Sequence, residues 1–120
     1  MMKQERIEYG DVWLVIEQAN VLMGIRRDGL IYRATQVEIE GEDEAMRYAR
    51  TILYPSLVAC VTSSGGRFGN IDFTSFPISF EDFCALPDDL RFKWQNAAMN
   101  LNPHWFGLSE ENEVKKKKSS

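Results

Sequence analysis

The chain has 120 residues, a length that fits one domain and excludes two domains of ordinary size. Hydrophobic residues make up 44% of it and aromatic residues 12%, which is enough apolar material for a core and excludes a wholly disordered chain. The formal net charge of -4 argues against nucleic-acid binding, because a phosphate backbone would meet overall repulsion.

Residues 1–13 contain no charged stretch followed by an apolar segment and a small-residue cleavage site, so we expect no signal peptide. The longest mostly apolar stretch, residues 12–25, is too short to span a bilayer and contains Glu17, Gln18 and Asn20. These features predict a cytoplasmic protein that does not bind a membrane.

The first predicted element is a strand at residues 12–16, because the run Val-Trp-Leu-Val-Ile is rich in β-branched and aromatic residues; a buried helical turn is the alternative. Beyond Glu17 the apolar residues recur at roughly helical spacing, which favours a strand that passes into a helix. The pair Asp28-Gly29 suggests a different arrangement, a hairpin turn followed by a returning strand. Both alternatives stay open for residues 7–40.

A helix is predicted to begin at residues 41–44, because acidic residues in a first turn complement the free amides and the helix dipole. The apolar positions that then recur every three or four residues are Met46, Ala49, Leu53, Leu57 and Cys60. Pro55 interrupts this pattern. We therefore expect one helix to end near Leu53 and a second, short helix to carry Pro55 in its first turn.

Residues 63–77 are predicted to form an irregular loop, because serine and glycine dominate its first half. The glycines at 65, 66 and 69 indicate a flexible loop rather than a phosphate-binding one, since the Gly-Lys-Ser/Thr ending is missing. A connection of this length is either a functional loop or the place of an unrecognised short strand.

A short helix is predicted after this loop. Ser79 and Asp82 have the spacing of a helix N-terminal cap, and Phe80, Phe83 and Leu86 supply one apolar face.

The best-defined helix of the sequence begins at Pro87, whose ring suits a first turn, and two acidic residues follow it. Its apolar stripe includes Leu90, Trp94 and Leu101. The helix should stop at Asn102-Pro103, because a residue before proline is pushed out of the helical region.

Together these elements predict a mainly α fold, with α+β as the alternative if the N-terminal segment forms a short strand or hairpin. We expect a small single domain at residues 1–109. Residues 110–120 are almost free of apolar side chains and should form a disordered tail, first acidic and then basic.

Catalytic and metal-binding residues are not predicted. The chain has one histidine and two cysteines, Cys60 and Cys84, too few for a metal site at matched spacing. His104 is the only imidazole, and we expect it to cap the carbonyls of the preceding helix. An enzyme that uses His104 with Asp88 or Asp89 is the least favoured alternative, so no catalytic residue, metal or cofactor is expected.

Aromatic residues in segments without a periodic core face indicate a surface that binds another protein. These candidate partner-binding residues are Phe68, Phe73, Phe76, Trp105 and Phe106.

The second half of the chain resembles a known family in the order and spacing of its hydrophobic and turn residues. The residues that carry this pattern are Pro55, Ser79, Phe80, Phe83, Leu86, Pro87, Trp94, Asn102, Pro103 and His104. Over residues 43–106 they resemble the small tail assembly chaperones encoded beside the tape measure gene in siphophages and prophages.

The resemblance implies a binding protein that coats the long, helical tape measure protein during tail morphogenesis, before tail tube subunits polymerise around it. It implies partners that are the tape measure protein and the tail tube protein, self-association, and a place in the host bacterial cytoplasm. A small cytoplasmic adaptor or regulatory module that binds one peptide is the alternative from another class.

Overall fold

The computed structural model describes residues 2–107 and contains a three-stranded antiparallel sheet in the order β1-β2-β3. The strands are β1 (Gln4–Tyr9), β2 (Val12–Glu17) and β3 (Val61–Gly65). Burial alternates along β2, where every second side chain is buried from Val12 onward, as expected for a strand with one face on a core. The strand predicted at residues 12–16 is confirmed, and its pairing places residues near 15 beside residues near 63.

The hairpin of the N-terminal segment lies between β1 and β2, not at Asp28-Gly29. Tyr9 pairs with Val12, and Gly10 occupies the turn with a φ of +58°, a conformation that favours glycine. Asp28 and Gly29 lie inside a helix, so the hairpin predicted there is wrong. A turn at Asp28-Gly29 would form a hairpin only if the segments on both sides paired, and both are helical instead.

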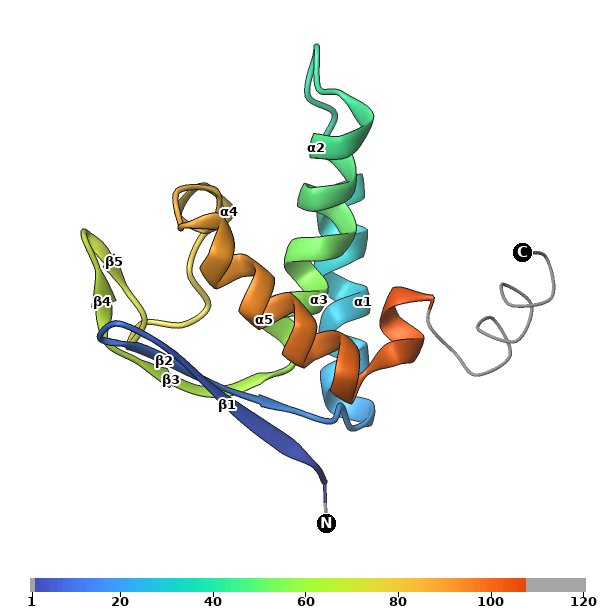
Figure 1. Ribbon diagram of the computed structural model, residues 1–120. Coiled ribbons are helices and arrows are strands. Elements are labelled where there is room, and N and C mark those ends of the chain that lie inside the picture. The colour runs from blue at the N-terminus through green and yellow to red at the C-terminus, as the bar shows by residue number, and fades with distance from the viewer. Residues whose placement is uncertain (1, 108–120) are drawn as a thin grey trace, which may run out of the picture.

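Two antiparallel helical segments form a hairpin that stands beside the sheet (Figure 1). One is α1 (Val21–Thr35), whose N-cap Asn20 accepts a hydrogen bond from the Met23 amide at 2.9 Å. The other runs through α2 (Glu44–Tyr48), η1 (Ala49–Leu53) and α3 (Tyr54–Ala59). The end that carries α2 projects beyond the rest of the molecule (Figure 1).

Pro55 widens the second segment instead of breaking it. Proline has no amide hydrogen to donate, and its ring clashes with the carbonyl four residues earlier in an α-helix. The preceding turn, η1, is a π-helix, and the Tyr54 amide donates to the carbonyl of Ala49. The predicted break near Leu53 is therefore wrong, while Pro55 does lie in the first turn of α3.

The two helices of the second half lie where the caps predict them. The Asp82 amide donates to the Ser79 hydroxyl at 3.1 Å and begins α4 (Phe80–Cys84). The longer helix is α5 (Asp88–Leu101), and a short 3-10 helix, η2 (Pro103–Phe106), follows it. Helix α5 packs against β1, β2 and α3, so it joins the sheet to the helical hairpin (Figure 1).

The predicted irregular loop at residues 63–77 is largely structured. It contains the end of β3 and a second hairpin of β4 (Arg67–Phe68) and β5 (Ile71–Asp72). Gly66 has a φ of +86°, and a Cβ placed on it would lie 1.9 Å from the Asp11 carbonyl oxygen. Glycine is thus required here for close packing of two backbones, and the irregular structure predicted for these residues is wrong.

The fold is α+β, with 51% helix and 20% strand, so the predicted mainly α class is wrong. The missing strands were short, and their pairing depends on segments far apart in the chain. The domain boundary predicted at residue 109 and the tail predicted at residues 110–120 lie outside the described residues.

Candidate partner-binding surface

Helix α1 is apolar on two opposite faces. Met23 and Leu30 face the core of the domain. On the other side four large apolar side chains are open to solvent, and together they are named the α1 stripe: Val21, Leu22, Ile25 and Tyr32, exposed by 79%, 62%, 61% and 66%. Spacings of three, four and seven residues place these side chains on one helix face about three turns long, where the exposed Asp28 lies between Ile25 and Tyr32.

The helix surface next to the α1 stripe has no side chain at Gly29. Gly29 follows Ile25 by one helical turn and precedes Tyr32 by nearly another, and a Cβ placed on it meets no atom within 4 Å. A glycine in the middle of a helix costs roughly 1 kcal/mol relative to alanine. Its position among exposed apolar side chains leaves room for another helix to approach the α1 backbone closely.

More exposed apolar side chains lie at the end of the helical hairpin, which we call the hairpin tip, residues 36–48. They are Val37, Ile39, Met46 and Tyr48. Helix α2 has no buried residue, so packing against a core does not hold the hairpin tip in place.

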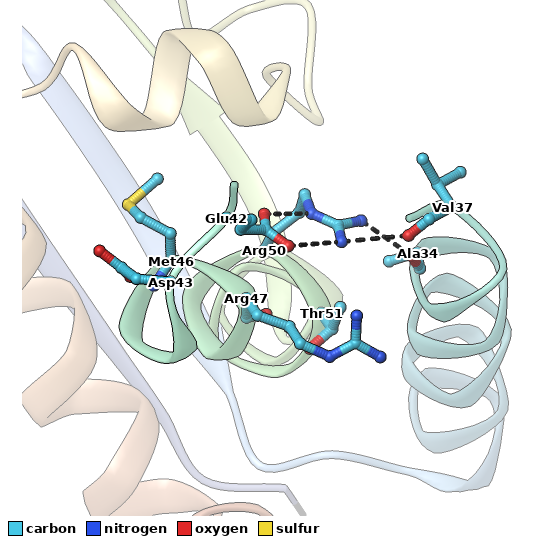
Figure 2. A network of polar contacts seen from close by, with 8 residues as sticks. All are labelled: Ala34, Val37, Glu42, Asp43, Met46, Arg47, Arg50 and Thr51. Atoms are coloured by element: carbon cyan, nitrogen blue, oxygen red, sulfur yellow. Dashed lines mark hydrogen bonds and ion pairs between the residues drawn. The ribbon is translucent and has the colours of Figure 1, made fainter. Parts of the chain in front are cut away.

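Arg50 holds the hairpin tip through four hydrogen bonds (Figure 2). Its Nε and Nη2 donate to the two carboxylate oxygens of Glu42 at 2.7 and 2.9 Å. Its Nη1 donates to the Ala34 carbonyl at 2.8 Å and Nη2 to the Val37 carbonyl at 3.2 Å. The Arg50 and Glu42 side chains are only 11% and 8% exposed. A bidentate pair with this geometry fixes the loop that joins α1 to α2.

The electrostatics of this pair predict a pH-dependent hairpin tip. Hydrogen bonds from Arg50 hold the pKa of Glu42 below its ordinary value of 4.5, although burial acts in the opposite direction. A carboxyl whose pKa is lowered by folding stabilises the folded state when ionised, and this contribution is lost as the pH falls through the folded-state pKa. The sensitive range therefore lies below pH 4.5.

We expect acidification from pH 6 to pH 3 to shift the amide NMR resonances of residues 36–48 with a midpoint below 4.5. The variant Glu42→Gln should show the shifted state already at pH 6, because the amide cannot form the ion pair. Glu44→Gln, an exposed change in the same segment, is the control. A midpoint at or above the ordinary value would contradict the assignment.

The five aromatic residues predicted to bind a partner do not form one surface. Phe73 is completely buried, and Phe76 packs against Trp94 with the ring centroids 6.1 Å apart. Trp105 and Phe106 are half-buried against the core. Phe68 alone is exposed, at 37%, on a strand far from η2 (Figure 1). The expectation that these loop segments leave their aromatic side chains free is wrong for Phe73, because the second hairpin packs it inward.

Trp105 has a structural partner of its own. Arg27 stacks over its ring at 5.2 Å and donates from Nη2 to its backbone carbonyl at 3.2 Å, while Nε donates to the Ser56 hydroxyl at 2.7 Å. Burial lowers the pKa of the Arg27 guanidinium from its ordinary value. These contacts tie η2 to both segments of the helical hairpin.

Most residues of the family-like pattern serve the core or helix ends. The buried members are Pro55, Phe83, Leu86, Trp94 and Asn102. Ser79 caps α4, Phe80 packs edge-on against Tyr54, and Pro87 precedes α5. Pro103 and His104 are exposed in η2.

His104 does not have the predicted capping role. It makes no hydrogen bond to any residue of the described part of the chain, and backbone amides of Asn102 and Trp105 donate to the nearby carbonyls instead. Asp88 and Asp89 lie at the beginning of α5 and His104 beyond its end, so a 14-residue helix of about 20 Å separates them. The structure does not bring these residues together. Within residues 2–107 no group of three His, Cys, Asp or Glu side chains is placed to hold a metal ion.

The two cysteines differ in their burial. Both cysteines are free, and Cys60 is buried, where desolvation raises the pKa of its thiol to about 12. Cys84 is exposed rather than buried.

The α1 stripe was not identified from the sequence, although a signal for it is present. Apolar residues at 21, 22, 23, 25, 30, 31 and 32 are too widely spread around one helix for a single buried face. Which of them lie outside depends on where the second helical segment packs.

Comparison with protein-family models, with curated proteins and with solved structures finds no match to this chain. Across residues 2–107, none of the helices combines the length and apolar character needed to cross a membrane.

Proposed function

We propose that the protein is a non-catalytic binding protein that holds an amphipathic helix of another polypeptide on the α1 stripe, in the manner of a phage tail assembly chaperone. Its partner is then the tape measure protein, with the tail tube protein as a second partner, in the host bacterial cytoplasm. Nucleic acid and membranes have no part in the proposal.

The observation that carries this proposal is the exposure of the α1 stripe. Solvent-exposed apolar residues are common singly, but four of them on one face of one helix are unusual and mark a surface that another polypeptide can cover. A partner helix with apolar residues at i, i+3, i+4 and i+7 matches such a row in both length and spacing.

The chaperone activity also needs weak binding of many copies. A tape measure protein presents a long series of similar helical turns, so modest affinity for each copy suffices when many copies bind side by side. Self-association of this chain is part of the proposal, because copies that occupy adjacent turns would contact one another.

The central test uses a synthetic helical peptide of three heptads with leucine along one face and glutamine beside it. We expect the double variant Ile25→Gln/Tyr32→Gln to bind this peptide about tenfold more weakly than the wild type, by fluorescence anisotropy, because part of the buried apolar area is lost. Its melting temperature should stay close to that of the wild type, since both side chains are exposed.

Phe92→Gln is the matched control, because Phe92 is an exposed apolar residue of α5, outside the α1 stripe. An affinity that is unchanged in the double variant, or equally reduced in the control, would refute the proposed surface.

Stoichiometry separates the chaperone from a single-peptide adaptor. A probe with four tandem copies of the helical peptide should bind several copies of the protein, as measured by light scattering after size exclusion. A complex with one copy per probe would favour the adaptor and contradict the chaperone.

A further inference from the structure

A pocket of about 510 Å³ lies along one edge of α1, between this helix, the start of β3 and the segment around residue 76. Its apolar walls include Leu30, Val58 and Phe76. Its polar lining includes Ser63, whose hydroxyl makes no hydrogen bond to any residue of the described part of the chain. The pocket thus combines an apolar interior with a hydroxyl that is free to bind a ligand.

Two arginines of α1, Arg26 and Arg33, also line this pocket. Neither has a carboxylate within 4.0 Å among residues 2–107, although the chain has a net charge of -4. The described arginines that do form ion pairs are Arg6, Arg27, Arg50, Arg67 and Arg91. Both guanidinium groups are therefore available to pair with negatively charged groups of a partner.

The spacing of these arginines matches the α1 stripe. They are seven residues apart, so about 10 Å separates their Cα atoms along the helix. On the helix surface they lie between the α1 stripe and Leu30, which faces the pocket. The flanking residues of a helix seated on the stripe would therefore lie beside Arg26 and Arg33.

We propose that this pocket takes an apolar side chain flanked by carboxylates, so that the partner helix is an acidic one whose Glu or Asp residues, seven positions apart, pair with Arg26 and Arg33. This inference rests on the proposed function and adds the chemistry of the partner. Guanidinium groups bind carboxylates through two parallel hydrogen bonds, which favours arginine at such positions.

Nucleic acid is the competing source of negative charge. Its phosphates would also bind arginine, but the net charge of -4 opposes a polyanion, and the apolar walls of the pocket offer nothing to a phosphate. An amphipathic acidic helix uses both the apolar and the basic parts of this surface.

The experiment compares two peptides of three heptads that share a leucine face. One has glutamate at flanking positions seven residues apart, and the other has glutamine there. At low salt we expect the wild type to bind the glutamate peptide about five- to tenfold more tightly. The preference is modest because each exposed ion pair contributes little to the binding free energy. This preference should weaken in 0.5 M salt because the charges are screened.

The variant Arg26→Gln/Arg33→Gln should bind both peptides equally, at the affinity of the wild type for the glutamine peptide. Arg47→Gln is the matched control, because Arg47 also has no ion pair within the described residues but does not line the pocket. The control should keep the full preference for glutamate.

The outcomes distinguish this inference from the proposed function. Equal binding of both peptides by the wild type, or a glutamate preference that survives in Arg26→Gln/Arg33→Gln, would overturn the inference alone. No binding of either peptide would overturn the proposed function as well. Displacement of the glutamate peptide by an equal concentration of single-stranded DNA of 20 nucleotides would overturn the assignment in favour of phosphate.

Discussion

Replacing Trp94 with alanine is expected to lower the free energy of unfolding by about 3–5 kcal/mol, the usual cost of removing a large aromatic side chain from a core. Trp94 is completely buried, and its ring lies 5.7 Å from Phe83 and 6.1 Å from Phe76. Its Nε1 donates to the Leu57 carbonyl at 3.0 Å. The residue therefore connects α5 to α3, to α4 and to the segment before α4.

The measurement is urea unfolding followed by circular dichroism at neutral pH. Small domains have a total stability of about 5–15 kcal/mol, so the alanine variant should be unfolded at much lower urea or be unfolded outright. Trp94→Phe keeps most of the ring but leaves the Leu57 carbonyl without its donor, and we expect an intermediate loss of about 1–3 kcal/mol. Phe92→Ala, two residues away and exposed, is the control and should change stability little. Equal losses for Trp94→Ala and Phe92→Ala would contradict the packing described for α5.

The variant Asn102→Ala is expected to cost about 2–4 kcal/mol, because it leaves two partly buried backbone groups without a partner. Asn102 is completely buried at the end of α5. Its Oδ1 accepts from the Ala19 amide at 2.7 Å, and its Nδ2 donates to the Glu17 carbonyl at 3.1 Å. A single side chain thus satisfies the backbone at the point where β2 turns into α1.

The variant Asn102→Asp tests the hydrogen-bond donor of this side chain separately from its acceptor. The carboxylate still accepts from Ala19 but cannot donate to the Glu17 carbonyl, so it should also destabilise the protein in urea unfolding. Asn100→Ala, at an exposed position of the same helix, is the control. If the changes at positions 100 and 102 were equally mild, the junction between β2 and α1 would not depend on Asn102.

Much of the local structure is encoded in short stretches of sequence. Ser79 and Asp82 identify the start of α4, and Pro87 with Asn102-Pro103 brackets α5 closely, because caps and prolines act through neighbouring backbone groups. The β-branched run at residues 12–16 likewise predicts its own strand. These signals need no information from the rest of the chain.

Strand pairing was decided by tertiary structure. Residues 63–65 have the composition of a loop, yet they belong to β3 because β2 offers them an open edge far away in the sequence. Gly65 and Gly66 suit this place because only glycine lets the backbone pass so close to Trp13 and Asp11. The mainly α prediction is wrong for this reason. A strand is stabilised by hydrogen bonds to a partner strand, and local sequence patterns do not reveal that partner.

The sequence by itself determined where the helices of the second half begin and end, that material for one core is present, and that large apolar residues occur around α1. Only the tertiary structure decided which side chains are exposed: Phe73 turned inward, while Ile25 and Tyr32 stayed outside. Helix caps form within one or two turns of the chain. The exposure of a side chain, in contrast, depends on which other segment packs against its face of the helix or sheet. That segment can lie at any distance along the sequence.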